Sequence, residues 1–211
     1  CRYSVDYAYS TGGNALKVLA LVSILMIALA GIASAQLDPD DDGIGVYFDP
    51  CACVICMELE PAIYTGYIVI THPTSPEGVG GWEARITYDG PVTVTNWVFQ
   101  GDAFNFMEPP DFFVGIGTPI INPFTYPAIV VATFELALLS DTPEVNFWID
   151  GVQRHSLPDR MPAYLDGADY NIIKPLQQPT GGPQYPVATI NGGCAVPNED
   201  VSWGSIKTLY R

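Results

Sequence analysis

The sequence predicts an all-β protein, an antiparallel β-sandwich with an irregular C-terminal extension, a short terminal helix and an N-terminal signal-peptide helix. Between residues 44 and 149, short apolar alternations are interrupted by Gly, Pro, Asn and Asp, a pattern typical of short antiparallel strands. The alternation is clearest in GGWEARITYDG, where Trp82, Ala84, Ile86 and Tyr88 share one face. Prolines fall between the apolar runs, where a missing amide donor breaks no strand ladder.

Composition excludes several functional classes. The chain of 211 residues has 23 Asp and Glu against 8 Lys and Arg, a net charge of -15, and 48% hydrophobic residues. So few cations cannot form the basic surface that a nucleic-acid binder needs, so we expect no nucleic-acid partner. The apolar content is sufficient for a buried core, which argues against disorder. The acidic balance makes calcium a reasonable counter-charge.

The N-terminal region predicts export. Lys17 precedes an uncharged apolar run, and the small residues Ala33, Ser34 and Ala35 form a cleavage site before Gln36. Without cleavage, residues 18–35 would be long enough for a membrane anchor, the one membrane contact that we expect. We therefore predict a leader and signal peptide at 1–35, a β-sandwich domain at 36–150 and a Pro/Gly-rich extension at 151–211. The protein is expected outside the cell or on its surface.

The strands are expected in chain order. The run at 129–139 is long enough for a helix, but its β-branched start and its alternation favour a central strand. After Gly151 strand signals are few, although Tyr164 and Leu165 indicate that part of the extension packs. Residues 198–211 predict an amphipathic helix, either a lid on the sandwich or a docking tag. The expected strands are 44–48, 62–71, 82–88, 92–99, 112–117, 129–139 and 145–149.

Four cysteines follow the predicted cleavage site: Cys51, Cys53, Cys56 and Cys194. In an exported chain they predict disulfides, with at least one bond from the first three to Cys194. Cys51 and Cys53 would pair only with strain. An incompletely paired set and a four-thiolate zinc site are the alternatives, and the irregular spacing disfavours zinc.

An acidic segment matches the spacing of a calcium loop. Asp38, Asp40 and Asp42 alternate before Gly43, and Asp49 takes the last position of the twelve-residue pattern. Alternate carboxylates and a Gly at the turn suit the oxygen shell of calcium. A solvated acidic leader is the simpler interpretation. No other cofactor is expected.

Catalytic residues are scarce. The histidines are His72 and His155, and no G-x-S-x-G turn is present to expose a nucleophile. We interpret both histidines as surface or capping residues and expect no enzyme.

Aromatic residues crowd the middle of the chain and supply the candidate ligand-binding set. It consists of Trp97, Phe104, Phe106, Phe112 and Tyr126. Exposed coplanar rings would stack on sugars, and exposed rings in general would bury against a protein partner. Packing in the core is the simpler interpretation.

Residues 79–150 carry a family resemblance. The segment GWEARITYD, the FVGIG run, AIVVATFELAL and VNFWI together resemble the immunoglobulin-like, cohesin-type or carbohydrate-binding-like sandwiches of bacterial secreted proteins. The resemblance implies a non-catalytic secreted module for adhesion, surface display or binding of a protein partner. The alternatives are a carbohydrate-binding module with a glycan partner and an uncleaved, membrane-anchored surface protein of the same fold.

Overall fold

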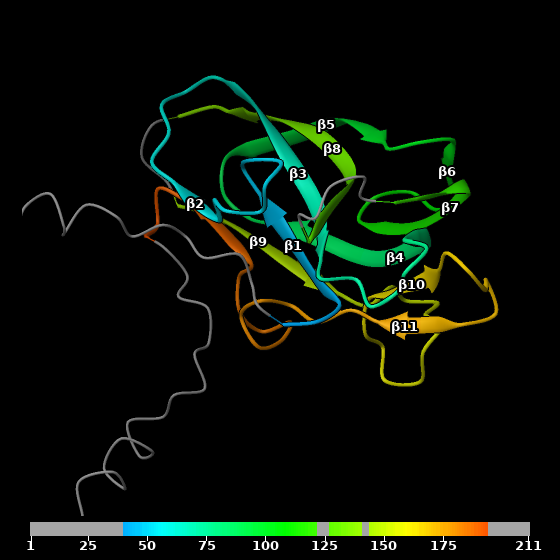
Figure 1. Cartoon of the computed structure of the whole chain (residues 1–211). Coiled ribbons are helices and arrows are strands. Elements are labelled where there is room, and N and C mark those ends of the chain that lie inside the picture. The colour runs from blue at the N-terminus through cyan, green and yellow to red at the C-terminus, as the bar shows by residue number, and fades with distance from the viewer. Residues whose placement is uncertain (1–39, 122–126, 141–143, 194–211) are drawn as a thin grey trace, which may run out of the picture. The chain divides into compact units, whose positions relative to one another are not determined.

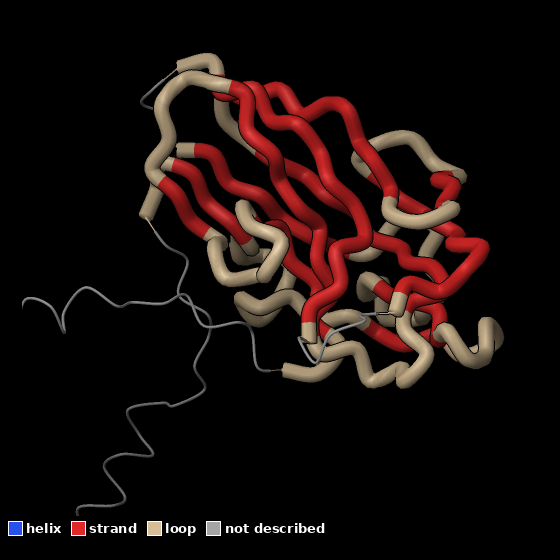
Figure 2. Tube along the Cα trace, turned by 45° about the horizontal axis from the view of Figure 1, so that its top comes forward, coloured by secondary structure: helices blue, strands red, loops and turns tan. Residues whose placement is uncertain are grey.

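The structure is a computed structural model that describes residues 40–121, 127–140 and 144–193. These residues belong to one compact unit, Ala35–Arg211, and all their regular elements are strands. The strands form two sheets packed face to face (Figures 1 and 2). The predicted all-β sandwich is therefore confirmed for the described residues. The predicted signal peptide and terminal helix lie outside them.

The first sheet has four antiparallel strands in the order β1, β3, β8, β5. Their bounds are Gly43–Tyr47, Ile63–Thr71, Ala128–Leu138 and Val92–Phe99. The expected strand at 129–139 is confirmed as β8, which lies between β3 and β5. Alternating apolar residues explain its central place, because they bury one face against the other sheet.

The second sheet has eight strands arranged around β4 (Val79–Tyr88). Glu83 pairs with β7 on one side and β10 on the other, and Arg85 pairs with β7 and β9. Thus β9 and β10 lie on the same side of β4, one after the other. Figure 1 shows β6 and β7 at one end of the sheet and β2 at the other. The bounds are β2 Cys56–Met57, β6 Ala103–Asn105, β7 Asp111–Ile120, β9 Val145–Asp150, β10 Ala163–Asp166, β11 Ile173–Pro175 and β12 Ala188–Ile190.

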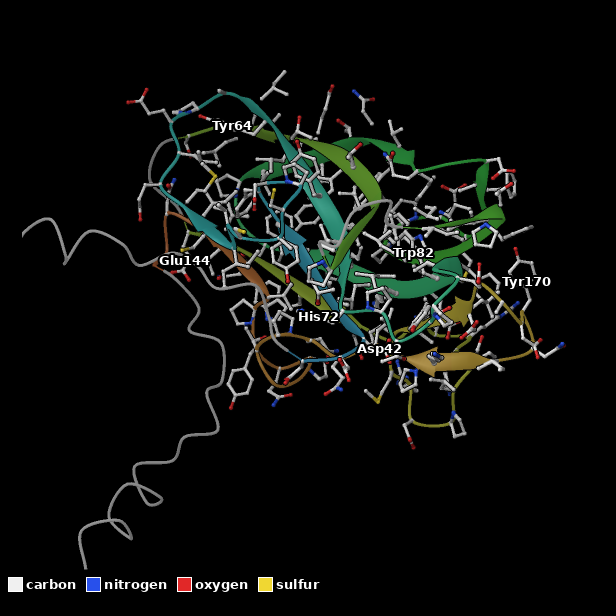
Figure 3. All side chains as sticks on the ribbon, viewed as in Figure 1. Asp42, Tyr64, His72, Trp82, Glu144 and Tyr170 are labelled. Atoms are coloured by element: carbon white, nitrogen blue, oxygen red, sulfur yellow. The ribbon has the colours of Figure 1, made fainter. Side chains whose placement is uncertain are left out.

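The main core lies between the sheets and contains a cluster of aromatic rings. The Trp97 ring lies 4.5 Å from that of Phe112 and 4.7 Å from that of Phe134, measured between centroids. Trp82, labelled in Figure 3, belongs to the same sheet as Phe112 and stacks on it with ring centroids 5.9 Å apart. Such pairs add about 0.5–1.5 kcal/mol each beyond the burial of their area.

A second, smaller core covers the opposite face of the first sheet. Tyr47 and Val69 point away from the main core and pack against Ala52 and Ile55. A bulge in β8 turns Val130 toward this side as well, because Ile68 pairs with Ala132 and Val69 with Val130. The segment 49–55, which contains two of the cysteines, therefore folds over the first sheet.

The extension is more regular than the sequence predicts. It supplies three strands, β10, β11 and β12. β10 pairs with β4, β11 pairs with β10, and β12 pairs with β9. As expected, Tyr164 is buried and Leu165 partly buried. Three strands of the extension are thus part of the second sheet.

Candidate binding surface

An exposed apolar surface lies on the outer face of the second sheet, where β6 and β7 form a hairpin. Phe104 pairs with Gly115, and the Phe106 amide donates to the Phe113 carbonyl oxygen at 2.9 Å. This register places the three phenylalanine side chains on one face. Phe104, Phe106 and Phe113 are 64%, 65% and 39% exposed.

The same face continues across β4 to β10 and β11. In register, Gly115 pairs with Gly81, Gly81 with Leu165, and Leu165 with Ile173. A Cβ on Gly115 would come within 3.2 Å of the Phe106 ring, and one on Gly81 within 3.2 Å of the Leu165 methyl. The glycines therefore allow these side chains to lie close to the sheet. We call Gly81, Phe104, Phe106, Phe113, Gly115, Leu165 and Ile173 the outer apolar face.

The rings of this face are perpendicular to one another. Phe104 and Phe106 have centroids 4.9 Å apart and planes at 74°. Phe106 and Phe113 are 6.3 Å apart with planes at 72°. They form an uneven apolar surface with gaps between ring edges, and not the flat platform on which a sugar ring stacks.

Hydrogen bonds hold the hairpin in this shape. The side-chain oxygen of Asn105 accepts hydrogen bonds from the backbone amides of Met107 at 3.3 Å and Phe113 at 3.0 Å. The side-chain nitrogen Nδ2 of Asn105 donates to the Met107 carbonyl at 2.6 Å. Arg85 and Asp111 form an ion pair of 2.9 Å on the adjoining part of β4 and β7. The backbone that carries the exposed rings is therefore held in place before any partner binds, which lowers the entropic cost of binding.

A buried carboxylate borders this surface. Glu83 is only 3% exposed, and its two oxygens accept from the Ser156 amide at 2.8 Å and the Ser156 hydroxyl at 2.7 Å. Glu83, Phe113, Leu165 and Ile173 are among the residues that line a shallow hollow here. Glu83 lies on the face of β4 opposite to Trp82 and Ala84, and the loop that carries Ser156 covers it.

The structure divides the predicted aromatic set. Phe104 and Phe106 are on the outer apolar face, whereas Phe112 is fully buried and Trp97 is partly buried against it. Including Trp97 and Phe112 in an exposed strip is therefore wrong, because both rings belong to the main core. Tyr126 lies outside the described residues. Phe113 and Leu165 belong to the surface but were not predicted to bind a ligand.

The calcium-loop interpretation is also wrong for the described residues. The extended strand β1 separates Asp42 from Asp49, so the segment does not wrap around an ion. Both carboxylate oxygens of Asp49 accept hydrogen bonds from backbone amides. One oxygen accepts from Cys51 at 3.2 Å, and the other accepts from Cys53 at 2.9 Å and Val54 at 2.7 Å. Asp40 is exposed, Asp38 lies outside the described residues, and no group of three or more acidic, His or Cys side chains in the described ranges could hold a metal.

Asp42 instead anchors an internal polar network. Its carboxylate accepts from the Thr74 amide at 2.7 Å, the Thr74 hydroxyl at 2.7 Å and the Tyr164 hydroxyl at 2.5 Å. Burial and the bond to Asp42 raise the pKa of Tyr164 far above its usual range. The network thus joins the start of β1 to the β3–β4 loop and to β10, beside β11 (Figure 3).

The cysteines lie in two places. Cys51 and Cys53 are in the loop over the first sheet, and Cys56 is in β2. Cys56 pairs in register with Thr189 of β12, and the Thr189 hydroxyl donates to the Gly193 carbonyl. Cys194 lies outside the described residues, so the disulfides remain a prediction.

Both histidines are partly buried. The Nδ1 atoms of His72 and His155 are buried without a hydrogen-bond partner in the described part of the chain. The Ser156 hydroxyl, next to His155 in sequence, is bonded to Glu83. Among the described residues no helix is long and apolar enough to cross a membrane.

Comparison with known proteins finds similarity at the level of structure. No family model matches the chain, and no curated protein matches it. The sixth cohesin of scaffoldin B from Acetivibrio cellulolyticus, solved with a Cel5 dockerin mutant, aligns at 8% identity and a TM-score of 0.45, over 72% of this chain and 99% of that one. A type II cohesin domain from the cellulosome of Acetivibrio cellulolyticus aligns at 14% identity and a TM-score of 0.41. This alignment covers 72% of this chain and 96% of that one. Both are cohesin domains.

Proposed function

We propose that the protein is a secreted, non-catalytic β-sandwich module whose outer apolar face binds a protein partner. The observation that carries this proposal is the exposure of Phe104 and Phe106 on a hairpin held rigid by Asn105. If a Phe side chain offers about 200 Å², covering two-thirds of it would contribute about 3 kcal/mol per ring. Two such rings are sufficient for the central anchors of an interface.

A protein partner fits this surface better than a glycan does. Rings at 74° and 72° leave pockets between edges and faces, which branched apolar side chains fill. The exposed acids Asp102 and Glu108 flank the hairpin strand, and the whole chain has a net charge of -15. We therefore expect a partner with apolar anchors surrounded by basic residues, because complementary charge speeds association.

Adhesion or surface display is the role that we propose for this binding. It rests on residues 17–35, whose pattern is that of an export signal. Retention of those residues would leave the same module anchored in a membrane.

The test is to purify a partner from the cell surface with the full chain and then measure its affinity for defined variants. Phe104→Ser combined with Phe106→Ser should weaken binding at least about 100-fold, since each anchor residue is worth tenfold or more. Leu139→Ser is the matched control, because Leu139 is 66% exposed and lies outside this face. Equal affinities of the double variant and the unmodified chain would refute the proposal, as would a glycan as the only binder.

A further inference from the structure

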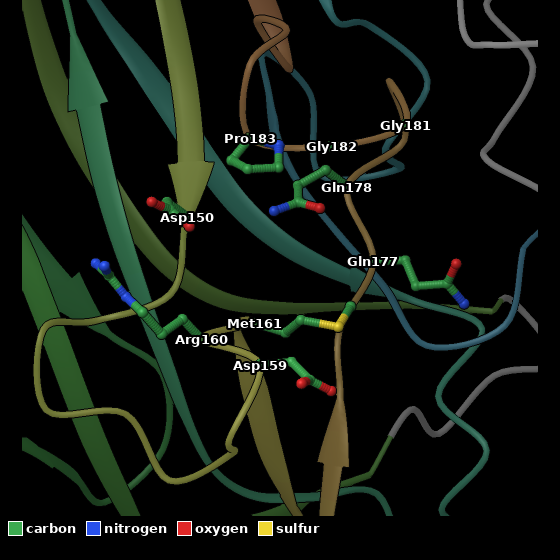
Figure 4. Close-up of a pocket in the computed structure, with 9 residues that line it drawn as sticks. All are labelled: Asp150, Asp159, Arg160, Met161, Gln177, Gln178, Gly181, Gly182 and Pro183. Atoms are coloured by element: carbon green, nitrogen blue, oxygen red, sulfur yellow. The ribbon is translucent and has the colours of Figure 1, made fainter.

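A polar pocket of about 440 Å³ lies where β9 ends, and it shares no residue with the outer apolar face. Asp150, Asp159, Arg160 and Met161 form one wall, and Gln177, Gln178 and the segment 181–183 form the other (Figure 4). Its volume is in the range of about 300–1,000 Å³ that is usual for small-molecule sites.

The topology of the sheet creates the first wall. Because β9 and β10 follow one another along the same side of β4, the residues between them must leave the sheet as a loop. A Cβ on Gly151 would lie 2.0 Å from the Arg160 carbonyl oxygen, so this glycine lets the two ends of the loop touch. Glu83 holds the middle of the loop through Ser156.

Arg160 is held in an unusual backbone conformation. Its φ is 53°, in the left-handed region that costs a non-glycine residue about 1–3 kcal/mol. The Arg160 amide donates to the Leu157 carbonyl at 3.2 Å, which closes the turn. The loop therefore places Arg160 in the lining of the pocket despite local strain.

The second wall is also fixed by hydrogen bonds. The Gln178 side-chain nitrogen donates to the Ile149 carbonyl at 3.1 Å, which leaves the Gln178 side-chain oxygen as an acceptor. The backbone N–H of Gln177 donates to the Asp42 backbone carbonyl at 2.9 Å. The backbone carbonyl of Gln177 accepts from the Ile44 N–H at 2.8 Å. Gly181 and Gly182 continue the wall without side chains.

The polar groups of the pocket match a neutral, hydroxyl-rich ligand. Asp150 and Asp159 accept hydrogen bonds, Arg160 donates them, and the Gln178 side-chain oxygen accepts them. Two carboxylates repel an anion, and the guanidinium repels a metal ion. A hydroxyl group donates and accepts at once and therefore suits this mixture. Met161 and Pro183 add apolar contact for C–H groups.

We propose that this pocket binds a saccharide unit, at a site separate from the proposed protein interface. No aromatic residue is among the described residues that line it, so binding rests on hydrogen bonds. For a ligand of monosaccharide size, typical energies per atom give a Kd of about 1–10 mM.

The test titrates the full chain with glucose, galactose, mannose and N-acetylglucosamine, using NMR chemical shifts or calorimetry. At least one sugar should bind with a millimolar Kd. Asp159→Asn and Arg160→Gly should each weaken that sugar at least about tenfold, by loss of charged hydrogen bonds. Glycine suits the φ of Arg160, so Arg160→Gly should fold at least as stably as the unmodified chain.

Phe106→Ala separates this proposal from the proposed function. Sugar affinity should stay unchanged in this variant, while binding of the protein partner falls. The pocket assignment is overturned if no sugar binds at about 50 mM, or if sugar binding survives both pocket variants. It is also overturned if Phe106→Ala abolishes sugar binding, or if inorganic phosphate or calcium binds the pocket and the sugars do not.

Discussion

Replacing Asp42 by alanine should lower the free energy of unfolding by about 3 kcal/mol. The bond from the Tyr164 hydroxyl carries most of this effect, because Tyr164 is 1% exposed and its hydroxyl cannot regain full hydration. Losing a bond between a charged and a buried group costs about 1.5–3 kcal/mol. The two Thr74 bonds add about 0.5 kcal/mol each, since Thr74 is exposed and water can replace Asp42 there.

The assay is urea unfolding of the full chain followed by tryptophan fluorescence, with calorimetry as a second measurement. For a domain of this size, the loss corresponds to a Tm lower by about 6–12 °C. Asp41→Ala is the control, because Asp41 is exposed and its side chain makes no hydrogen bond in the described residues. We expect the control to change stability by less than about 0.5 kcal/mol.

A double-mutant cycle with Tyr164→Phe isolates the central bond. In that background, Asp42→Ala should cost only about 1 kcal/mol, since the hydroxyl is already absent. Additive effects of the two changes would contradict the reasoning, as would an Asp42→Ala chain as stable as the Asp41→Ala control.

Three further predictions concern separate parts of the fold. The hydrogen bond from the Ala168 backbone amide lowers the pKa of the Asp166 carboxyl. The carboxylate of Asp166 therefore contributes stability above pH 3.8, and this contribution is lost as the pH falls further. Asp166→Asn should flatten this acid dependence in unfolding experiments. Cys56 pairs with Thr189, whose hydroxyl bonds to Gly193, the residue before Cys194, so peptide mapping without reduction should find a disulfide between Cys56 and Cys194. A chain with both thiols reduced would contradict it. Gly66→Ala should cost about 1–3 kcal/mol in urea unfolding, because its Cβ would lie 2.2 Å from the Phe134 ring, and an unchanged midpoint would disprove this packing.

The long strands could be predicted from the sequence because alternation is a local property. Strand β5 has the expected bounds of 92–99, and β8 differs from its expected range by one residue at each end. The strands β10, β11 and β12 have four, three and three residues, too few for a period to appear. Their place depends on pairing with distant strands, which no local pattern encodes.

The predicted aromatic site was wrong in two strands, for a different reason in each. In β7, Phe112, Val114 and Ile116 face the core, and this spacing is a signal that could have placed Phe113 outside. In β5, a register shift between Thr95 and Val98 changes which residues point inward, so Trp97 packs in the core. Phe106 and Leu165 belong to one surface only because β4 pairs with both β7 and β10. This pairing is tertiary structure that the local sequence pattern does not encode.

The pairing of β12 has a consequence for how the chain reaches its native state. β12 lies between β9 and β2, and β2 precedes it in sequence by more than a hundred residues. Until residues 188–190 have left the ribosome, β2 has no neighbour in its sheet and the edge of β9 stays open. Closing such distant pairs is slow, so this edge of the second sheet forms late, after residues 188–190 have been synthesised.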